Sequence, residues 1–164
     1  MHLTTVILDG STRAGRVEGD EVVILDAPDV GAVFAQGGSA ELGRSISFTD
    51  AQLAPMVTAP DKIVCVGVNY LDHVAEMGRD KPAAPTYFAK YRSALIGARD
   101  DIALPSPDIS TDIDWEVELA IVIGSTVRDA SADEALAAIG GYTVLNDVSV
   151  RDYQRRTTQF LAGK

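Results

Sequence analysis

The chain has 164 residues, of which 46% are hydrophobic, so it is long enough to bury one sizeable core and a small additional unit. Its formal net charge of -10 argues against a general nucleic-acid binder, because neutralising phosphates requires clustered Lys and Arg. A single cysteine excludes an internal disulfide, and no apolar run approaches the ~20 residues of a membrane helix. The N-terminus also lacks the basic start and apolar core of a signal peptide, so we expect a cytoplasmic protein that binds neither nucleic acid nor membrane.

Residues 1–58 are predicted to form a small, separate α+β unit. Strands are expected at 4–8 and 22–25, with turn signals between them, so a hairpin or meander is favoured. A weak helix over 30–36 ends at a pair of glycines, and residues 46–48 are expected to close the sheet. This part shows no recognisable constellation of chemical groups, so we interpret it as a supporting domain. The proline-containing segment 55–60 is expected to be a linker.

The next predicted strand, 62–68, is apolar and expected to be buried, and it leads into a polar segment that holds the first candidate site residues. His73 and Glu76 are three residues apart, so a helical turn places them on one face. In that arrangement a carboxylate orients an imidazole, and the pair can act as a base on water. The alternative is an exposed histidine beside a helix-surface glutamate, which is the more common arrangement.

A short strand is expected over 86–90, and it ends in a basic residue. Lys90 and Arg92 are positive charges in an acidic chain, so they are candidates to face an anionic ligand. Ordinary surface lysine and arginine remain the more common explanation.

The stretch 112–123 combines acidic residues with a strongly apolar run. As a strand it places Asp114, Glu116 and Glu118 on one face, because side chains alternate with period two. Successive same-face positions lie roughly 6.6–6.8 Å apart, so two glutamates can lean onto one cation with oxygens about 2.0–2.6 Å from it. The alternative is an edge strand with a solvated acidic face that discourages pairing. Both interpretations remain open from this stretch alone.

A helix and a strand are expected after this stretch. Ser131 and Glu134 are spaced as a capping box for a helix over 132–139, which is expected to stop at two glycines. A strand is then expected over 142–145, with Asn146 and Asp147 directly after its end.

A polar helix is predicted from residue 148 onwards. It places Asp147, Arg151 and Gln154 along one face, at steps of four and three residues. This set could be a simple ion pair within the chain, worth a few tenths of a kcal/mol. Alternatively, the planar guanidinium of Arg151 could bind a carboxylate in a bidentate manner. The last residues, 161–164, show no cap or closing strand, so the chain is expected to be cut off there.

The order of the polar motifs resembles that of the fumarylacetoacetate hydrolase family over about residues 60–164. Four motifs occur in series, namely Gly67-Val68-Asn69-Tyr70-Leu71-Asp72-His73, Asp114-Trp115-Glu116-Val117-Glu118-Leu119, Asn146-Asp147-Val148-Ser149-Val150-Arg151-Asp152 and Gly163-Lys164. The resemblance implies a β-rich α+β fold in which a small N-terminal domain (1–58) precedes a mixed β-sandwich or roll catalytic domain (59–164). It also implies that the C-terminal part of the catalytic domain is missing.

The resemblance further implies roles for individual residues. A divalent cation, Mg²⁺ or Mn²⁺, is expected on three carboxylates, those of Glu116, Glu118 and Asp147. The implied catalytic residues are His73 and Glu76, which position or activate water, and Lys164, which stabilises enolate or oxyanion charge. The implied substrate-binding residues are Arg151, Gln154 and Tyr70. Some family members carry a further acidic ligand seven residues before the histidine, where this chain has Val66, so it is similar to the three-carboxylate branch.

The chemistry implied is metal-dependent hydrolysis of a carbon–carbon bond in a β-diketo or 2-oxo acid, such as an acylpyruvate or a fumarylacetoacetate-like compound, through an enolate. One alternative is an isomerase or decarboxylase of 2-hydroxymuconate-type or 2-oxo diacids, which places the chain in aromatic-compound catabolism. The others are a non-catalytic fragment that only binds metal, and a scaffold that has kept the fold. The expected partners are a small anionic oxo-acid substrate and a second copy of the chain in a homodimer.

Overall fold

The computed structural model describes residues 1–78 and 80–164, which fold into a strand-rich α+β structure, as the sequence predicts. Contacts divide the chain into two compact units. Unit 1 comprises Met1–Pro60, Leu95–Ile102 and Glu118–Leu145, and unit 2 comprises Asp61–Ala94, Ala103–Val117 and Asn146–Lys164. The division into domains at residue 58 stays a prediction. The helices in the described residues are all too short or too polar to span a bilayer.

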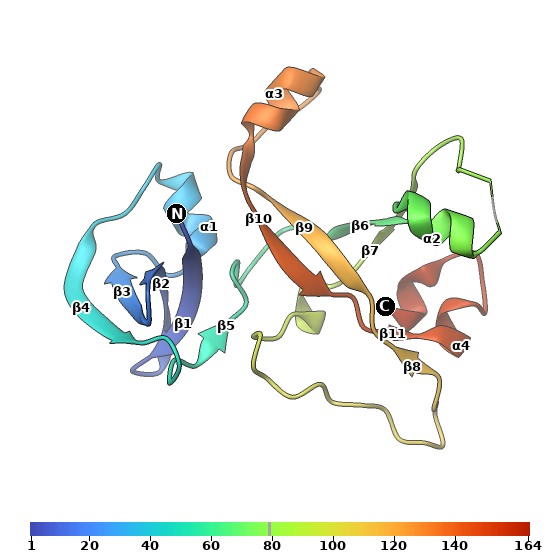
Figure 1. Cartoon of the computed structure of the whole chain (residues 1–164), viewed down its shortest axis with the longest axis horizontal. Helices are drawn as coiled ribbons and strands as arrows, with labels where there is room; N and C mark the ends of the chain where they lie inside the picture. Colours follow the sequence, from blue (N-terminus) through green and yellow to red (C-terminus); the bar gives the residue numbers. More distant parts are fainter. Residues whose placement is uncertain (79) are drawn as a thin grey trace. The chain divides into compact units, whose positions relative to one another are not determined.

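Unit 1 is built on a five-stranded antiparallel sheet with the order β4-β3-β2-β1-β5 (Figure 1). Its strands are β1 (Leu3–Leu8), β2 (Ser11–Glu18), β3 (Glu21–Leu25), β4 (Glu41–Ser47) and β5 (Leu53–Ala54). Asp9 and Gly10 link β1 to β2 with φ angles of 51° and 78°, the left-handed backbone that a two-residue hairpin turn requires. The predicted strands at 4–8 and 22–25 are confirmed. Strand β2 was not predicted, because its glycine and arginines hide the alternating pattern.

Unit 1 has two apolar clusters. In the first, Val6, Val22 and Ile24 of the sheet are fully buried. In the second, Ala14 and Leu25 of the sheet pack with Val33 of the short helix α1 (Val30–Ala35). The Asp29 carboxylate caps α1 by accepting a hydrogen bond from the Ala32 amide at 2.8 Å. The helix predicted at 30–36 is therefore confirmed, and the buried Asp29 is its N-cap.

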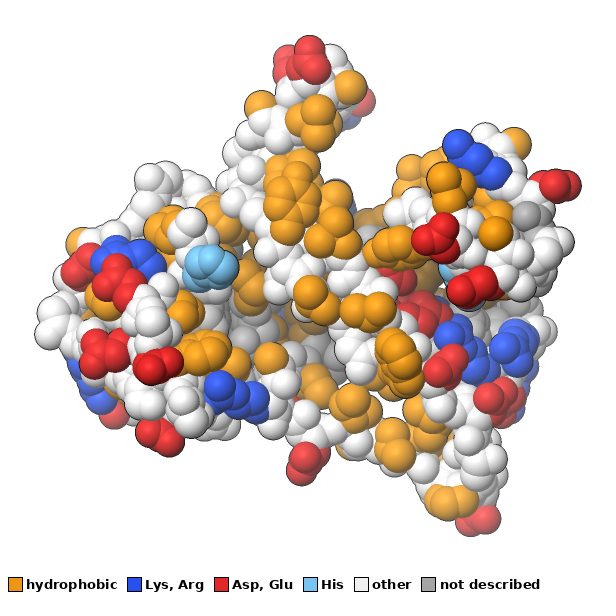
Figure 2. Space-filling view, in the orientation of Figure 1, with side chains coloured by type: hydrophobic (Ala, Val, Ile, Leu, Met, Phe, Trp, Pro, Cys, Tyr) orange, Lys and Arg blue, Asp and Glu red, His pale blue; other side chains and the backbone are white. Residues whose placement is uncertain are grey.

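Strands β9 (Val117–Ile123) and β10 (Ile139–Asn146) form a two-stranded ribbon with helix α3 (Ala132–Ala137) at its far end (Figure 1). The capping box of Ser131 and Glu134 is confirmed, but α3 ends before the two glycines, which lie in β10. One face of the ribbon is apolar and exposed, as Figure 2 shows, and includes Val117, Ile121, Ile123, Tyr142 and Val144.

Unit 2 contains two small antiparallel pairs of strands and several short helices. Strand β6 (Val64–Gly67) pairs with β7 (Thr86–Ala89), and β8 (Ile113–Asp114) pairs with β11 (Ser149–Val150). The helices are α2 (Leu71–Glu76), η1 (Arg92–Ala94), α4 (Arg151–Gln154) and η2 (Phe160–Gly163).

Two predictions about these elements were wrong. The stretch 112–123 is not one continuous strand, because residues 115 and 116 separate β8 from β9. The polar helix predicted from residue 148 is limited to α4, because residues 149 and 150 extend to pair with β8. Both differences arise from the short β8–β11 pair. It gives residues 113 and 114 a different partner from β9, and it holds residues 149 and 150 extended.

Candidate metal and active site

The β8–β11 pair brings two acids of unit 2, Glu116 and Asp147, close together. Ser149 lies opposite Asp114 in this pair. Just beyond it, the Asp147 amide donates to the carbonyl of Glu116 at 2.9 Å. The side-chain amide oxygen of Asn146 accepts from the Glu116 amide at 3.3 Å. The backbone therefore fixes Glu116 and Asp147 as neighbours although they are far apart in sequence.

Three carboxylates, which the sequence predicts to share a cation, lie close together here. Glu116, Glu118 and Asp147 each offer one oxygen, and these atoms lie within 4.8 Å of one another. Asp147 is only 1% exposed, and the side chain of Glu116 is 24% exposed. Carboxylate oxygens at this spacing suit a hard divalent cation such as Mg²⁺ or Mn²⁺. The donor set therefore fits the metal that the sequence predicts.

Three cationic side chains of unit 2 contact the carboxylates of Glu116 and Asp147. Lys90 Nζ donates to Asp147 Oδ1 at 2.5 Å and to the Val148 carbonyl at 3.1 Å. Lys164 Nζ donates to Glu116 Oε2 at 2.8 Å and to Asp147 Oδ2 at 2.9 Å. The Lys164 side chain is 1% exposed and that of Lys90 is 10% exposed, so both ammonium groups lie in a nearly dry environment. Buried charges of this kind are tolerated because they are paired.

Arg151 is the third cationic side chain, and it binds Asp114 and Glu116. Its Nε and Nη2 atoms donate to Asp114 Oδ2 at 3.0 and 2.8 Å, and its Nη1 atom donates to Glu116 Oε1. A further bond from Nη1 reaches Gln154 Oε1 at 3.0 Å. The Arg151 guanidinium lowers the pKa of the Asp114 carboxyl below its usual value, with help from the Trp115 amide. Burial acts to lower the pKa of Arg151, but the hydrogen bonds to Asp114 and Glu116 outweigh it and raise that pKa.

These contacts are ion pairs within the chain, one of the two alternatives that the sequence offers for Arg151. The partner differs from the expected one, because Arg151 pairs with Asp114 and Glu116 instead of Asp147. Substrate binding by Arg151 and Gln154 stays a prediction.

Close packing at the end of η2 positions Lys164 beside the carboxylates. A Cβ atom at Gly163 would lie 2.4 Å from the Gln154 nitrogen and 2.5 Å from the Val150 oxygen, so only glycine fits there. Phe160 packs edge-on against Phe88 with ring centroids 5.7 Å apart. The Lys164 ammonium lies 5.1 Å from the Phe88 ring centroid. These contacts hold the ammonium against an aromatic wall, where its charge is weakly screened.

His73 and Glu76 form a pair on α2, away from these contacts. His73 Nδ1 lies 3.7 Å from Glu76 Oε2, and the two side chains are 58% and 78% exposed. Within residues 1–78 and 80–164, no hydrogen bond or ion pair joins this pair to the carboxylates. Tyr70, at the start of α2, is also exposed. The catalytic role of the pair and the substrate role of Tyr70 stay predictions.

A hollow of about 260 Å³ adjoins α2 in the same unit. Its lining includes Val68, Leu71, Val74 and Lys81. Val68 has a φ angle of 55°, a conformation that a β-branched residue adopts only under strain. This strained residue directly precedes the polar segment that carries Asn69 and Tyr70, so the chain changes direction at the edge of the hollow.

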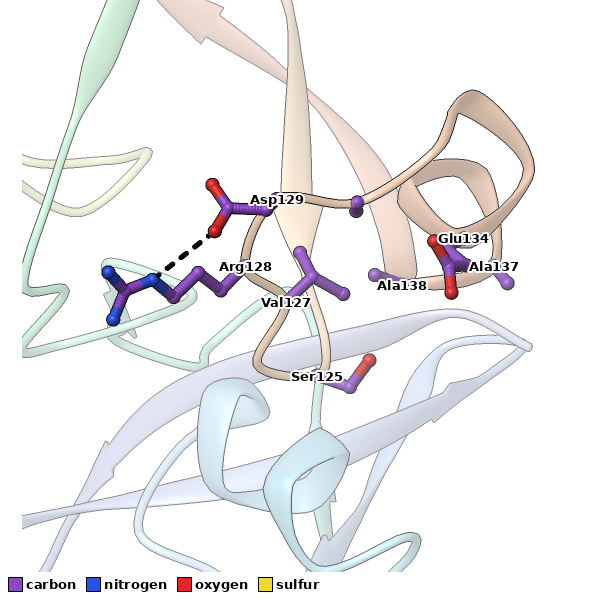
Figure 3. Close-up of a pocket in the computed structure, with 8 residues that line it drawn as sticks. Ser125, Val127, Arg128, Asp129, Glu134, Ala137 and Ala138 are labelled. Atoms are coloured by element: carbon purple, nitrogen blue, oxygen red, sulfur yellow. Dashed lines mark ion pairs between the residues drawn. The ribbon is translucent and has the colours of Figure 1, made fainter.

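A second hollow, of about 430 Å³, lies in unit 1 beside α3 (Figure 3). Figure 3 shows Glu134, Ala137 and Ala138 on one side of it and the segment with Val127, Arg128 and Asp129 on the other. Arg128 and Asp129 are 3.5 Å apart and almost fully exposed. Such a pair contributes little binding or stability. The lining includes none of the three clustered carboxylates, so this hollow is a weaker candidate site.

Sequence reasoning missed the roles of two residues in this arrangement. Lys90 was considered only as a charge facing an anionic ligand, whereas it binds the carboxylate of Asp147. Ser149 is fully buried and donates to the Asp147 carbonyl at 3.1 Å. The available signal for Lys90 was a lysine at the end of a strand in an acidic chain, which is too common to identify a partner 57 residues away.

Comparison with known proteins supports the importance of this region. A model of the family described as Fumarylacetoacetate (FAA) hydrolase C-terminal matches residues 62–164. The mitochondrial oxaloacetate tautomerase FAHD2A of Homo sapiens is 47% identical over 114 residues, which are 68% of this chain and 35% of that protein. The chain thus spans about a third of the length of these curated relatives.

Solved structures match a larger part of the chain. A 5-carboxymethyl-2-hydroxymuconate delta-isomerase from Mycobacterium smegmatis aligns with a TM-score of 0.80 and 32% identity, over 100% of this chain and 62% of that one. A fumarylacetoacetate hydrolase from psychrophilic Exiguobacterium antarcticum aligns with a TM-score of 0.78 and 29% identity, over 99% of this chain and 61% of that one.

Proposed function

Because the chain belongs to the fumarylacetoacetate hydrolase family, we propose that it catalyses keto–enol isomerisation of a small 2-oxo diacid. In this reaction the enol hydroxyl loses a proton and the neighbouring carbon gains one, so it needs no oxidant and no water. The observation that carries the proposal is the buried cluster in which Glu116 and Asp147 lie against Lys164. The tautomerase and the isomerase among the similar proteins also support it.

A divalent cation, Mg²⁺ or Mn²⁺, would be held by Glu116, Glu118 and Asp147 and would supply concentrated positive charge for the enolate form of the substrate. The residues of the chain have separate tasks around it. Lys164 places an ammonium group in a nearly dry environment, where a donor aimed at developing negative charge is most effective. Lys90 and Arg151 orient Asp147 and Glu116 through the hydrogen bonds described above.

The second candidate function is hydrolysis of a carbon–carbon bond in a β-diketo or 2-oxo acid. It is favoured by His73 and Glu76, which are close enough to interact on one face of α2. Hydrolysis requires a base that activates water, whereas isomerisation does not. Decarboxylation of a 2-oxo diacid passes through the same enolate and does not require the pair either.

Two assays on the same preparation separate these functions. The decay of the enol form of oxaloacetate is followed by ultraviolet absorbance, and pyruvate release from acetylpyruvate is followed by a coupled assay, each with and without Mg²⁺. We expect Mg²⁺-dependent enol decay that falls roughly 100-fold or more in Lys164→Met, the size of loss seen when one donor to a developing oxyanion is removed. We expect His73→Asn to retain this activity.

Other outcomes would redirect the assignment. Pyruvate release that depends on His73 would favour hydrolysis. A chain that binds the cation and catalyses neither reaction would support the non-catalytic alternative. Enol decay at the same rate with and without Mg²⁺ would contradict the proposed function.

A further inference from the structure

All four carboxylate oxygens of Glu116 and Asp147 already have cationic partners within unit 2. Arg151 binds Oε1 of Glu116, and Lys90 binds Oδ1 of Asp147. The remaining two oxygens, Oε2 of Glu116 and Oδ2 of Asp147, both accept from Lys164. Among the described contacts, Lys164 alone bridges the two carboxylates. A divalent cation that binds these two carboxylates must therefore share or take an oxygen that a cationic side chain already contacts.

We propose that the Lys164 ammonium is an exchangeable counter-cation, which a divalent cation replaces on Glu116 Oε2 and Asp147 Oδ2 while Lys90 and Arg151 keep their oxygens. The inference rests on the metal site of the proposed function. It adds that cation binding and the position of Lys164 are coupled.

Geometry favours Lys164 as the group that leaves. Its displacement frees one oxygen on each carboxylate in a single movement, whereas displacing Lys90 or Arg151 frees an oxygen on only one of them. Lys90 also has a second anchor in the Val148 carbonyl, and Arg151 has Asp114 and Gln154. Lys164 has its two hydrogen bonds to the carboxylates and a position over the Phe88 ring.

The repulsion between the Lys164 ammonium and a divalent cation also favours displacement of Lys164. Lys164 and Asp147 are each 1% exposed, so water screens the repulsion between an ammonium and a divalent cation only weakly there. Two cations on the same pair of oxygens would repel strongly. Displacement turns Lys164 from a partner of the carboxylates into a free ammonium beside them, where an anionic oxo-acid can accept its hydrogen bonds.

Mn²⁺ titration of three forms of the chain, followed by the electron paramagnetic resonance signal of free Mn²⁺, tests the exchange. Lys164→Met removes the cation that must leave, so its Kd for Mn²⁺ should be about tenfold lower than that of the unaltered chain. Lys90→Met is the matched control, because it removes an equal charge from the oxygen that the metal does not take. It should tighten binding less than Lys164→Met does, because Lys90 holds no oxygen that the metal takes and Asp147 also loses a group that orients it.

A second measurement uses only the unaltered chain and does not depend on whether a variant folds. Reductive methylation followed by mass spectrometry reports how accessible each lysine amine is. Addition of Mg²⁺ should raise the labelling of Lys164 several-fold and leave that of Lys90 unchanged.

The outcomes separate this inference from the proposed function. Weaker or equal Mn²⁺ binding by Lys164→Met, or Lys164 labelling that is insensitive to Mg²⁺, would overturn the exchange while leaving the metal site in place. Failure of the unaltered chain to bind Mn²⁺ at all would overturn both.

Discussion

Asp29 shows how much a single buried acid can contribute to unit 1. Its carboxylate accepts hydrogen bonds from the Ala32 amide at 2.8 Å and from the Thr58 amide and hydroxyl at 2.8 and 2.6 Å. Burial acts to raise the pKa of this carboxyl, but the hydrogen bonds from Thr58 and Ala32 outweigh it and lower the pKa. One side chain thus caps α1 and ties residue 58 to it.

The lowered pKa fixes the sign of a pH effect. A carboxyl with a lower pKa in the folded state stabilises the fold above its unfolded pKa, near 3.8, and this contribution is lost as the pH falls toward the folded pKa. Asp29→Asn should therefore lower the free energy of unfolding at pH 7 by about 1–2 kcal/mol. Its loss of stability as the pH falls below about 4 should be shallower than that of the unaltered chain. Urea unfolding at several pH values measures both effects, and parallel pH profiles would contradict the prediction.

The residues of the candidate site were only partly predictable from sequence. Spacing along a strand suggested that Glu116 and Glu118 share a cation, and the family motifs added Asp147. The partners of these acids were not predictable, because Lys90 and Lys164 reach them from segments far away in the chain. Arg151 was expected to pair along a helix, but the chain is extended at residues 149 and 150, so its guanidinium reaches Asp114 instead.

At the scale of elements, local signals placed the start of α3 and the apolar run of β9 correctly, but not the ends of the strands. The capping box at α3 and the apolar run of β9 lie where the sequence places them. The break at Trp115 and Glu116 was not predictable from alternation, which continues through it. It arises because β8 and β9 pair with different partners, β11 and β10 respectively. A partner in another part of the chain decides where such a strand ends.

The packing of η2 against α4 makes a specific prediction at this scale. Gly163→Ala places a Cβ within 2.4 Å of the Gln154 backbone nitrogen, so the end of η2 must shift and carry Lys164 with it. We expect a loss of roughly 1–3 kcal/mol in the free energy of unfolding, the usual cost of overpacking. Denaturant unfolding measures this loss. Gly141→Ala is the control, because the nearest atom, Phe34 Cζ, is 3.6 Å away; an equal loss in both variants would contradict the account.

At the scale of the whole molecule, the strongest departure from expectation is the exposure of apolar strands. Strand β6 was predicted to be buried, yet Val64 is 60% exposed, and Val144 on β10 is 74% exposed. The sequence pattern correctly identified these segments as strands. It could not determine what covers them, because burial depends on neighbours that an apolar run does not specify.

This exposure can be measured directly. A contiguous apolar surface binds the dye ANS, so the chain should enhance ANS fluorescence, and Ile121→Lys combined with Val144→Lys should reduce the enhancement. Substitution of an exposed polar residue of unit 1, Thr49→Lys, serves as the control. Equal dye binding by all three proteins would contradict the exposed face.

The homodimer stays a proposal from sequence. Sedimentation velocity across a range of concentrations tests it. A single species with the mass of one 17.4 kDa chain at all concentrations would exclude the homodimer.

The central claim is that Glu116, Glu118 and Asp147 hold a divalent cation, and the most direct test is the melting temperature as a function of Mg²⁺ or Mn²⁺ concentration. Ligand that binds only the native state stabilises it, so the melting temperature of the unaltered chain should rise by roughly 5–10 °C when the cation reaches about 100 times its Kd. Glu116→Ala should lose this rise, and Asp72→Asn, an exposed acid on α2, should keep it. A melting temperature that does not respond to either cation, or that responds equally in Glu116→Ala, would contradict the account.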